Sequence, residues 1–87
     1  METATDKARF VYHLVHHDAD ARWHLRRAGT SDDVAAFDSK EQGRQDGERR
    51  GRAHLARGEL AQLVVHREDG SFETEFTYGA DPHNVPG

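Results

Sequence analysis

Alternating hydrophobic and polar residues mark two strands near the start of the chain. Residues 9–16 (RFVYHLVH) and 22–28 (RWHLRRA) place aromatic and branched apolar side chains at a period of two, which is typical of strands. The short polar loop 17–20 between them predicts an antiparallel hairpin. This loop sets the apolar pairs that share one face of the sheet, Leu14 with Trp23 and Tyr12 with Leu25.

A second hairpin is predicted in the last third of the chain. Residues 62–67 and 71–77 alternate in the same way, and Asp69-Gly70 between them is a strong signal for a two-residue turn. The turn pairs Val65 with Thr74 and Leu63 with Phe76, again on one face. The same alternation assigns Phe72 to the apolar face and places Glu73 opposite His66 on the other face.

One helix separates the two hairpins. Residues 39–57 lack the period of two, Asp38 or Ser39 can cap their first turn, and Gly58 is a natural stop. Residues 34–37 (VAAF) form a short apolar approach to the helix. The predicted fold is α+β, in the order β-β-α-β-β, with two antiparallel hairpins forming one sheet and a single helix packed on one face. The order of the strands in the sheet stays open.

Glycine recurs every four residues in the predicted helix, at Gly43, Gly47 and Gly51, although each costs a helix interior about 1 kcal/mol relative to alanine. Leu55 continues this helix-packing face. Three interpretations are open: large side chains of the sheet (Leu14, Trp23, Phe72 and Phe76) fill the space, a second subunit packs there, or the helix is irregular. We favour packing on the chain's own sheet.

The opposite face of the sheet has no predicted cover. Its valines lie among histidines and charged residues, and the interaction candidates on it are Val11, His13, Val15, Arg22, His24, Arg26 and Val64. Such a sheet can cover this face by forming a homodimer, or it can stay monomeric, because antiparallel sheets tolerate water on one side. We expect a protein-interaction or self-association module, with a second copy or an unidentified protein as the partner.

Three histidines of this face, His13, His24 and His66, are candidates for a metal site such as one for zinc. In the predicted register His13 lies directly opposite His24. The spacing matches no standard metal motif, so solvated strand residues are the preferred interpretation. No metal and no cofactor is predicted.

Composition narrows the remaining classes of function. The 87 residues suffice for one domain, expected at 9–78 between a flexible segment (1–8) and an irregular tail (79–87). The absence of cysteine excludes disulfides and thiolate chemistry. No apolar run reaches the roughly 20 residues of a membrane span, and the N-terminus does not resemble a signal peptide. A cytoplasmic protein without membrane association is expected.

No residues point to catalysis. Ser39 is accounted for as a cap, and no glycine-rich phosphate loop follows a strand, so we do not expect an enzyme. The alternative function is nucleic-acid binding through Arg22, Arg26 and the helix arginines. It is not favoured, because the net charge is −4 and acidic residues interleave with the helix arginines.

Several fragments together resemble a bacterial family of unknown function, the one numbered 2188. They are Tyr12-His13, Trp23, Asp38-Ser39-Lys40, 63–66 (LVVH), Asp69-Gly70, Tyr78-Gly79 and Asp81-Pro82. The resemblance covers roughly residues 10–87 and implies a compact β-β-α-β-β domain with no assigned activity or cofactor. The chain departs from the pattern at the first turn (HDADA), where relatives tend to have glycines, and in the helix, where relatives tend to have alanine or larger apolar residues.

Overall fold

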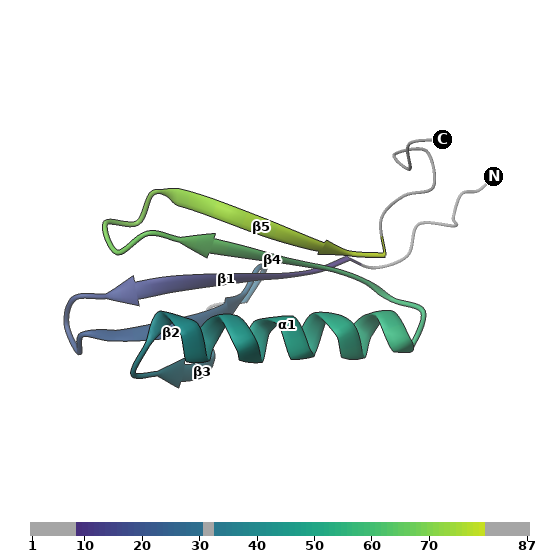
Figure 1. Ribbon diagram of the computed structural model, residues 1–87, viewed down its shortest axis with the longest axis horizontal. Coiled ribbons are helices and arrows are strands. Elements are labelled where there is room, and N and C mark those ends of the chain that lie inside the picture. The colour runs from purple at the N-terminus through teal and green to yellow at the C-terminus, as the bar shows by residue number, and fades with distance from the viewer. Residues whose placement is uncertain (1–8, 31–32, 80–87) are drawn as a thin grey trace.

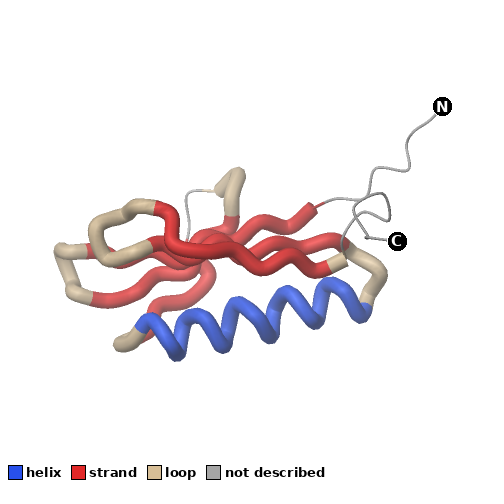
Figure 2. The backbone as a smooth tube through the Cα atoms, turned by 45° about the horizontal axis from the view of Figure 1, so that its top comes forward, coloured by secondary structure: helices blue, strands red, loops and turns tan. Residues whose placement is uncertain are grey.

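A computed structural model describes residues 9–30 and 33–79 of the chain. The elements follow in the order β1 (Arg9–His17), β2 (Arg22–Arg27), β3 (Asp33–Phe37), α1 (Lys40–Ala56), β4 (Leu60–His66) and β5 (Phe72–Tyr78). They form one mixed sheet with α1 against one face, as Figures 1 and 2 show. The predicted α+β fold is confirmed, with one addition. The apolar segment before the helix belongs to an edge strand, β3. The expected flexible segment 1–8 and all but the first residue of the expected tail lie outside the described residues.

The strand order is β3-β2-β1-β4-β5, so the two predicted hairpins meet through β1 and β4. These two central strands run parallel, whereas the other neighbouring pairs are antiparallel. Between β3 and β4 the chain crosses the sheet as α1, and this crossing lets β4 enter beside β1 in the same direction.

The first hairpin forms, but its predicted register is wrong by two residues. Its loop is 18–21 rather than 17–20, and the observed pairs include Leu14 with Leu25 and His16 with Trp23. A shift by two keeps every side chain on its predicted face. Ala21 closes the loop with a φ of 57°, and the Asp20 side chain accepts a hydrogen bond from the backbone N–H of Arg22 at 3.0 Å. The turn chemistry of Asp20 thus sets the register.

The second hairpin has the predicted pairs, Leu63 with Phe76 and Val65 with Thr74, but a different turn. The backbone N–H of Gly70 donates to the Arg67 carbonyl, and Gly70 has a φ of 94°, so the loop holds three residues, 68–70. The longer loop shifts the pairing of His66 by one residue. A β-bulge at Glu73 restores the predicted register from the pair of Val65 with Thr74 onward.

Because of this bulge, the predicted faces of Phe72 and Glu73 are both wrong. His66 pairs with Phe72 rather than with Glu73, so Phe72 lies on the face away from the core and is 53% exposed. The Glu73 carboxylate instead bonds Lys40 Nζ at 2.5 Å, on the helix side of the sheet. One extra residue in an edge strand is enough to exchange the faces of two side chains.

The glycines of α1 lie directly on the core. Leu14, Leu25 and Leu63 of the sheet are fully buried. A Cβ at Gly43 would lie 2.5 Å from Leu14 Cδ1, and one at Gly47 would lie 2.7 Å from Leu63 Cδ1. These distances are shorter than a van der Waals contact, so the missing side chains allow the helix to sit this close to the sheet.

The C-terminal half of α1 continues the same pattern. Gly51 faces the ring of Tyr78, and His54 rather than Leu55 follows on the packed face. His54 is 7% exposed, stacks on Phe10 with the ring centroids 4.1 Å apart, and bonds the Tyr12 hydroxyl at 2.7 Å. Leu55, which was expected to extend the glycine face, is 46% exposed.

Both ends of α1 are capped. The Ser39 hydroxyl accepts from the backbone N–H of Gln42 at 3.1 Å, as the sequence predicts. At the other end Glu59 N–H donates to the His54 carbonyl and Gly58 N–H to the Leu55 carbonyl. This Schellman arrangement requires a positive φ, and Gly58 supplies it at 79°.

Candidate functional site

The side of the sheet away from α1 is the candidate functional surface, and we call it the open face. Its position follows from the alternation of the strands: Tyr12, Leu14 and Leu63 point into the core, so their neighbours point outward. The open face is formed by Val11, His13, Val15 and His17 of β1, His24 and Arg26 of β2, Val64 and His66 of β4, and Phe72 of β5. All the predicted interaction residues except Arg22 therefore share it.

The side chain of Arg22 extends around the edge of the sheet, away from the open face. It pairs with His17 in the backbone register, but its guanidinium reaches around to Asp38, with 3.1 Å between Nε and Oδ1. Val64, in contrast, is only 9% exposed because neighbouring side chains already cover it.

His13 and His66 form a direct pair at the centre of the open face. His13 Nδ1 lies 3.0 Å from His66 Nε2, and His66 Nδ1 lies 3.1 Å from the carbonyl oxygen of Gly70. Because a carbonyl can only accept, the neutral His66 ring carries its hydrogen on Nδ1 and receives one from His13 Nδ1. Burial, followed by the nearby His66 and Arg26 charges, lowers the pKa of His13 below its ordinary 6.5.

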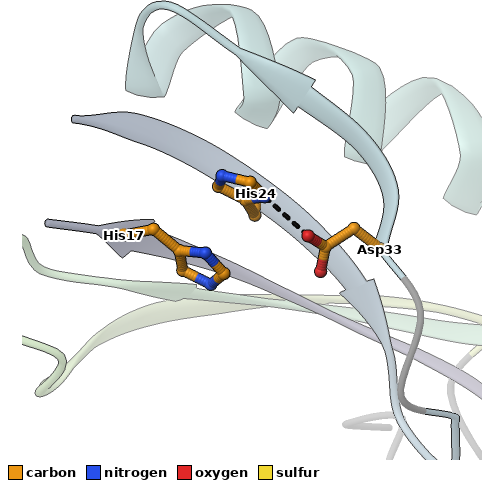
Figure 3. Close-up of side chains that lie close together, drawn as sticks. All are labelled: His17, His24 and Asp33. Atoms are coloured by element: carbon orange, nitrogen blue, oxygen red, sulfur yellow. Dashed lines mark hydrogen bonds and ion pairs between the residues drawn. The ribbon is translucent and has the colours of Figure 1, made fainter. Parts of the chain in front are cut away.

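A second group lies toward the β2–β3 edge, and we call it the His24 cluster: His17, Asp20, His24 and Asp33. His24 Nδ1 lies 2.6 Å from Asp33 Oδ2, and His24 Nε2 lies 2.8 Å from Asp20 Oδ2. The rings of His17 and His24 stack, with centroids 3.8 Å apart and planes 15° from parallel. Figure 3 shows His17, His24 and Asp33 arising from three neighbouring strands. Ligand atoms of His17, His24 and Asp33 all lie within 4.8 Å of one another.

Asp33 reaches this cluster because β3 contains a bulge. The register changes from Leu25–Ala35 to Arg26–Asp33, so Val34 is the extra residue. Without it, Val34 would stand opposite Arg26 and Asp33 would point to the other face. The bulge therefore aims the carboxylate at both His24 and the Arg26 guanidinium, whose Nε lies 3.4 Å from Oδ1.

His24 has a carboxylate at each ring nitrogen, and this arrangement favours the imidazolium. Burial alone would lower the pKa of His24, but the hydrogen bonds and charges of Asp33 and Asp20 outweigh it and raise the pKa above 6.5. The Asp20 carboxyl also has a lowered pKa; burial opposes this shift, whereas the hydrogen bonds from His24 and the Arg22 backbone produce it. The two carboxylates thus stabilise the protonated form of His24 relative to its neutral form.

The structure divides the three histidines proposed as metal ligands between two groups. His13 and His66 contact each other, whereas His24 belongs with His17 and Asp33. In the sequence, His17 falls in the predicted loop 17–20 and Asp33 in no predicted strand, so neither was a candidate ligand. The separation of His17 and His24 across a short hairpin loop is the one signal that could have paired them.

The chain was compared with known families and proteins. The sequence profile of a family described as "Uncharacterized protein conserved in bacteria" (DUF2188) matches residues 12–78, more than half of the 87-residue chain. The chain belongs to the DUF2188 family. No curated protein and no solved structure matches it. In the described part of this DUF2188 chain, no helix is long and apolar enough to cross a membrane.

Seven of the ten arginines in the described part of this DUF2188 domain are paired with carboxylates, and this pairing does not favour the nucleic-acid alternative. Arg22 bonds Asp38 and Arg26 faces Asp33. The helix pairs are Arg44 with Glu41 and Glu48, Arg49 and Arg50 with Asp46, Arg52 with Glu48, and Arg57 with Glu59. Phosphate binding would have to compete with a carboxylate at each of these positions.

Proposed function

We propose that this DUF2188 domain is a non-catalytic module that self-associates as a homodimer through the open face. The observation that carries the proposal is the exposed Phe72, which the β5 bulge places on the uncovered side of the sheet beside His66. The histidines of this face are held by one another, by carboxylates and by a backbone carbonyl, which suits a recognition surface. In this proposal the domain acts in the cytoplasm, as the sequence analysis expects.

The apolar part of the proposed interface is small. Val11 and Val15 are half-buried, and Val64 is already covered, so Phe72 offers the largest gain. Complete burial of a phenylalanine side chain is worth about 1.5–3 kcal/mol, and Phe72 is half exposed, so covering it contributes about 1 kcal/mol per copy. We therefore expect a weak, reversible dimer.

The edges of the sheet are less suited to association than its open face. Both edge strands contain a bulge, at Val34 in β3 and at Glu73 in β5, and bulges interrupt the row of backbone groups that another strand would pair with. Strand β3 is also short, with five residues. These features support contact by the face rather than by strand addition.

Sedimentation equilibrium tests the proposal. We expect the mass to rise from one chain toward two as the concentration approaches about 1 mM, where binding is worth about −4 kcal/mol. Phe72→Glu should keep the protein monomeric. Leu55→Glu is the matched control, because Leu55 is similarly exposed but lies on α1. A wild-type mass of one chain throughout, or dissociation caused by Leu55→Glu and not by Phe72→Glu, would overturn the proposal.

A further inference from the structure

We propose that His17, His24 and Asp33 bind a divalent transition-metal ion of the Zn²⁺ class, and that Asp20 positions His24 through its other ring nitrogen. This inference does not depend on dimerisation, because all four residues belong to one chain. It also departs from the grouping that the sequence suggests, since neither His13 nor His66 takes part.

The types of donor define the class of metal. Two imidazoles and a carboxylate are the ligands of zinc, cobalt and nickel sites, whereas calcium and magnesium prefer sites made of oxygen alone. His24 Nδ1 and Asp33 Oδ2 are 2.6 Å apart, and the ligand atoms of all three residues lie within 4.8 Å. Ligands about 2.0–2.2 Å from a zinc ion lie roughly 3.3–3.6 Å from one another in a tetrahedron. The separation of His24 Nδ1 and Asp33 Oδ2 is shorter than this value, so these two atoms must move apart to hold an ion.

The adjustment needed to hold an ion is confined to side chains. The rings of His17 and His24 are nearly parallel, so their lone pairs do not yet converge on a point. Rotation of the rings about their last side-chain bond tilts the nitrogens toward Asp33, and a small movement of its carboxylate makes room for the ion. The ion then replaces the proton between His24 Nδ1 and Asp33 Oδ2, and this proton is released to the solvent.

Three neighbouring strands carry the ligands of the cluster. His17 ends β1, His24 lies within β2 and Asp33 begins β3, and these three strands are adjacent in the sheet. The bulge at Val34 turns Asp33 onto the same face as the two histidines. In Figure 3 all three side chains project from the side of the sheet away from α1.

Asp20 accepts the hydrogen bond that the second ring nitrogen of a metal-bound histidine usually donates. When Nδ1 binds the ion, Nε2–H donates to Asp20 Oδ2, which lies 2.8 Å away. Such a carboxylate fixes the ring orientation and raises the basicity of the ligand, and its loss typically costs about 10- to 100-fold in affinity. Three protein ligands leave at least one position for water, so the site is open rather than closed.

Isothermal titration of the tag-free 87-residue chain with ZnCl₂ tests the proposal, and the absorption of bound Co²⁺ reports the ligands. We expect one ion per chain. His17→Asn and Asp33→Asn should each lower the affinity at least about tenfold and change the Co²⁺ spectrum. Asp20→Asn should weaken binding but leave the type of spectrum unchanged, because it removes only a positioning contact.

His13→Asn and His66→Asn are the matched controls, since they remove histidines of the same face outside the cluster. Both should bind Zn²⁺ as the wild type does. Circular dichroism checks that every variant is folded. Absence of Zn²⁺ and Co²⁺ binding by the folded wild type would overturn the proposal, and so would binding that is lost in the controls but kept in His17→Asn and Asp33→Asn.

Discussion

Replacing Gly47 with leucine tests whether the bare face of α1 sets the distance between the helix and the sheet. A Cβ at this position would lie 2.7 Å from Leu63 Cδ1 and 2.9 Å from Cδ2. Leu63 is fully buried on a central strand, so its side chain has no route into water. Either Leu63 leaves its preferred rotamer or α1 moves away from the sheet.

The expected loss of stability follows from two opposing terms. Overpacking a core typically costs about 1–3 kcal/mol, and leucine adds three carbons beyond the clashing Cβ, so we take about 3 kcal/mol. Exchanging glycine for leucine in a helix interior stabilises the helix by about 0.8 kcal/mol. The net loss is about 2 kcal/mol, which lowers the Tm of a domain of this size by about 8–16 °C.

Thermal and urea unfolding followed by circular dichroism measure this loss. Ala53→Leu is the control, because it introduces the same side chain at an exposed position of α1. It should change the free energy of unfolding by no more than about 0.5 kcal/mol. A Gly47→Leu variant as stable as the wild type, or more stable, would refute the close contact between α1 and Leu63.

Three further changes test the turn, the buried polar contact and the histidine pair. Ala21→Gly should stabilise the protein by about 0.5–1 kcal/mol in urea unfolding, because alanine is strained at a φ of 57°; Ala19→Gly in the same loop should give no gain. Tyr12→Phe removes the hydrogen bond to the buried His54 and should cost about 1–2 kcal/mol of unfolding free energy, whereas an unchanged Tm would show that this contact is not formed. The pKa of His13 is lowered in the folded state, so its neutral form is favoured there. The stability that this group contributes is therefore present above pH 6.5 and is lost as the pH falls through the folded pKa. As the pH falls over that range, the difference in unfolding free energy between wild type and His13→Asn should become smaller. A difference that does not change with pH would contradict a lowered pKa of His13 in the folded state.

The sequence was sufficient for the core-facing residues of β1 and β4 and for both helix ends. The period of two assigned Leu14 and Leu63 to the core, and the capping residues located the start and end of α1. These features are set by residues that are close together in the sequence, so they can be predicted from it. Even the error of two residues in the first hairpin left those faces intact, because side chains alternate with the same period.

The bulges could not be predicted from the alternation. Each adds one residue to an edge strand, and the pattern of Phe72 and Glu73 reads equally well without it. Residues 34–37 contain two alanines and follow a polar loop, so the segment gave little sign of a strand. The two bulges place Phe72 and Asp33 on the open face, which is why the sequence analysis missed the residues that carry both proposals.

The histidine groupings depended on strand order as well. Only the parallel contact of β1 with β4 brings His13 beside His66, and two residues of register separate His24 from the position opposite His13. The crossing of α1 sets which strands are neighbours, and the turn at Asp20 sets the register of the first hairpin, so neither grouping follows from the alternation alone.

The central claim is that the open face of this DUF2188 domain is its interaction surface. Amide chemical shifts from ¹H–¹⁵N spectra, recorded as the protein is diluted from about 1 mM, test it most directly because association near that concentration is expected to be weak. We predict concentration-dependent shifts at Val11, Val15, His66 and Phe72, with the amides of α1 unchanged. Spectra that do not vary with concentration, or shifts confined to α1, would contradict the claim.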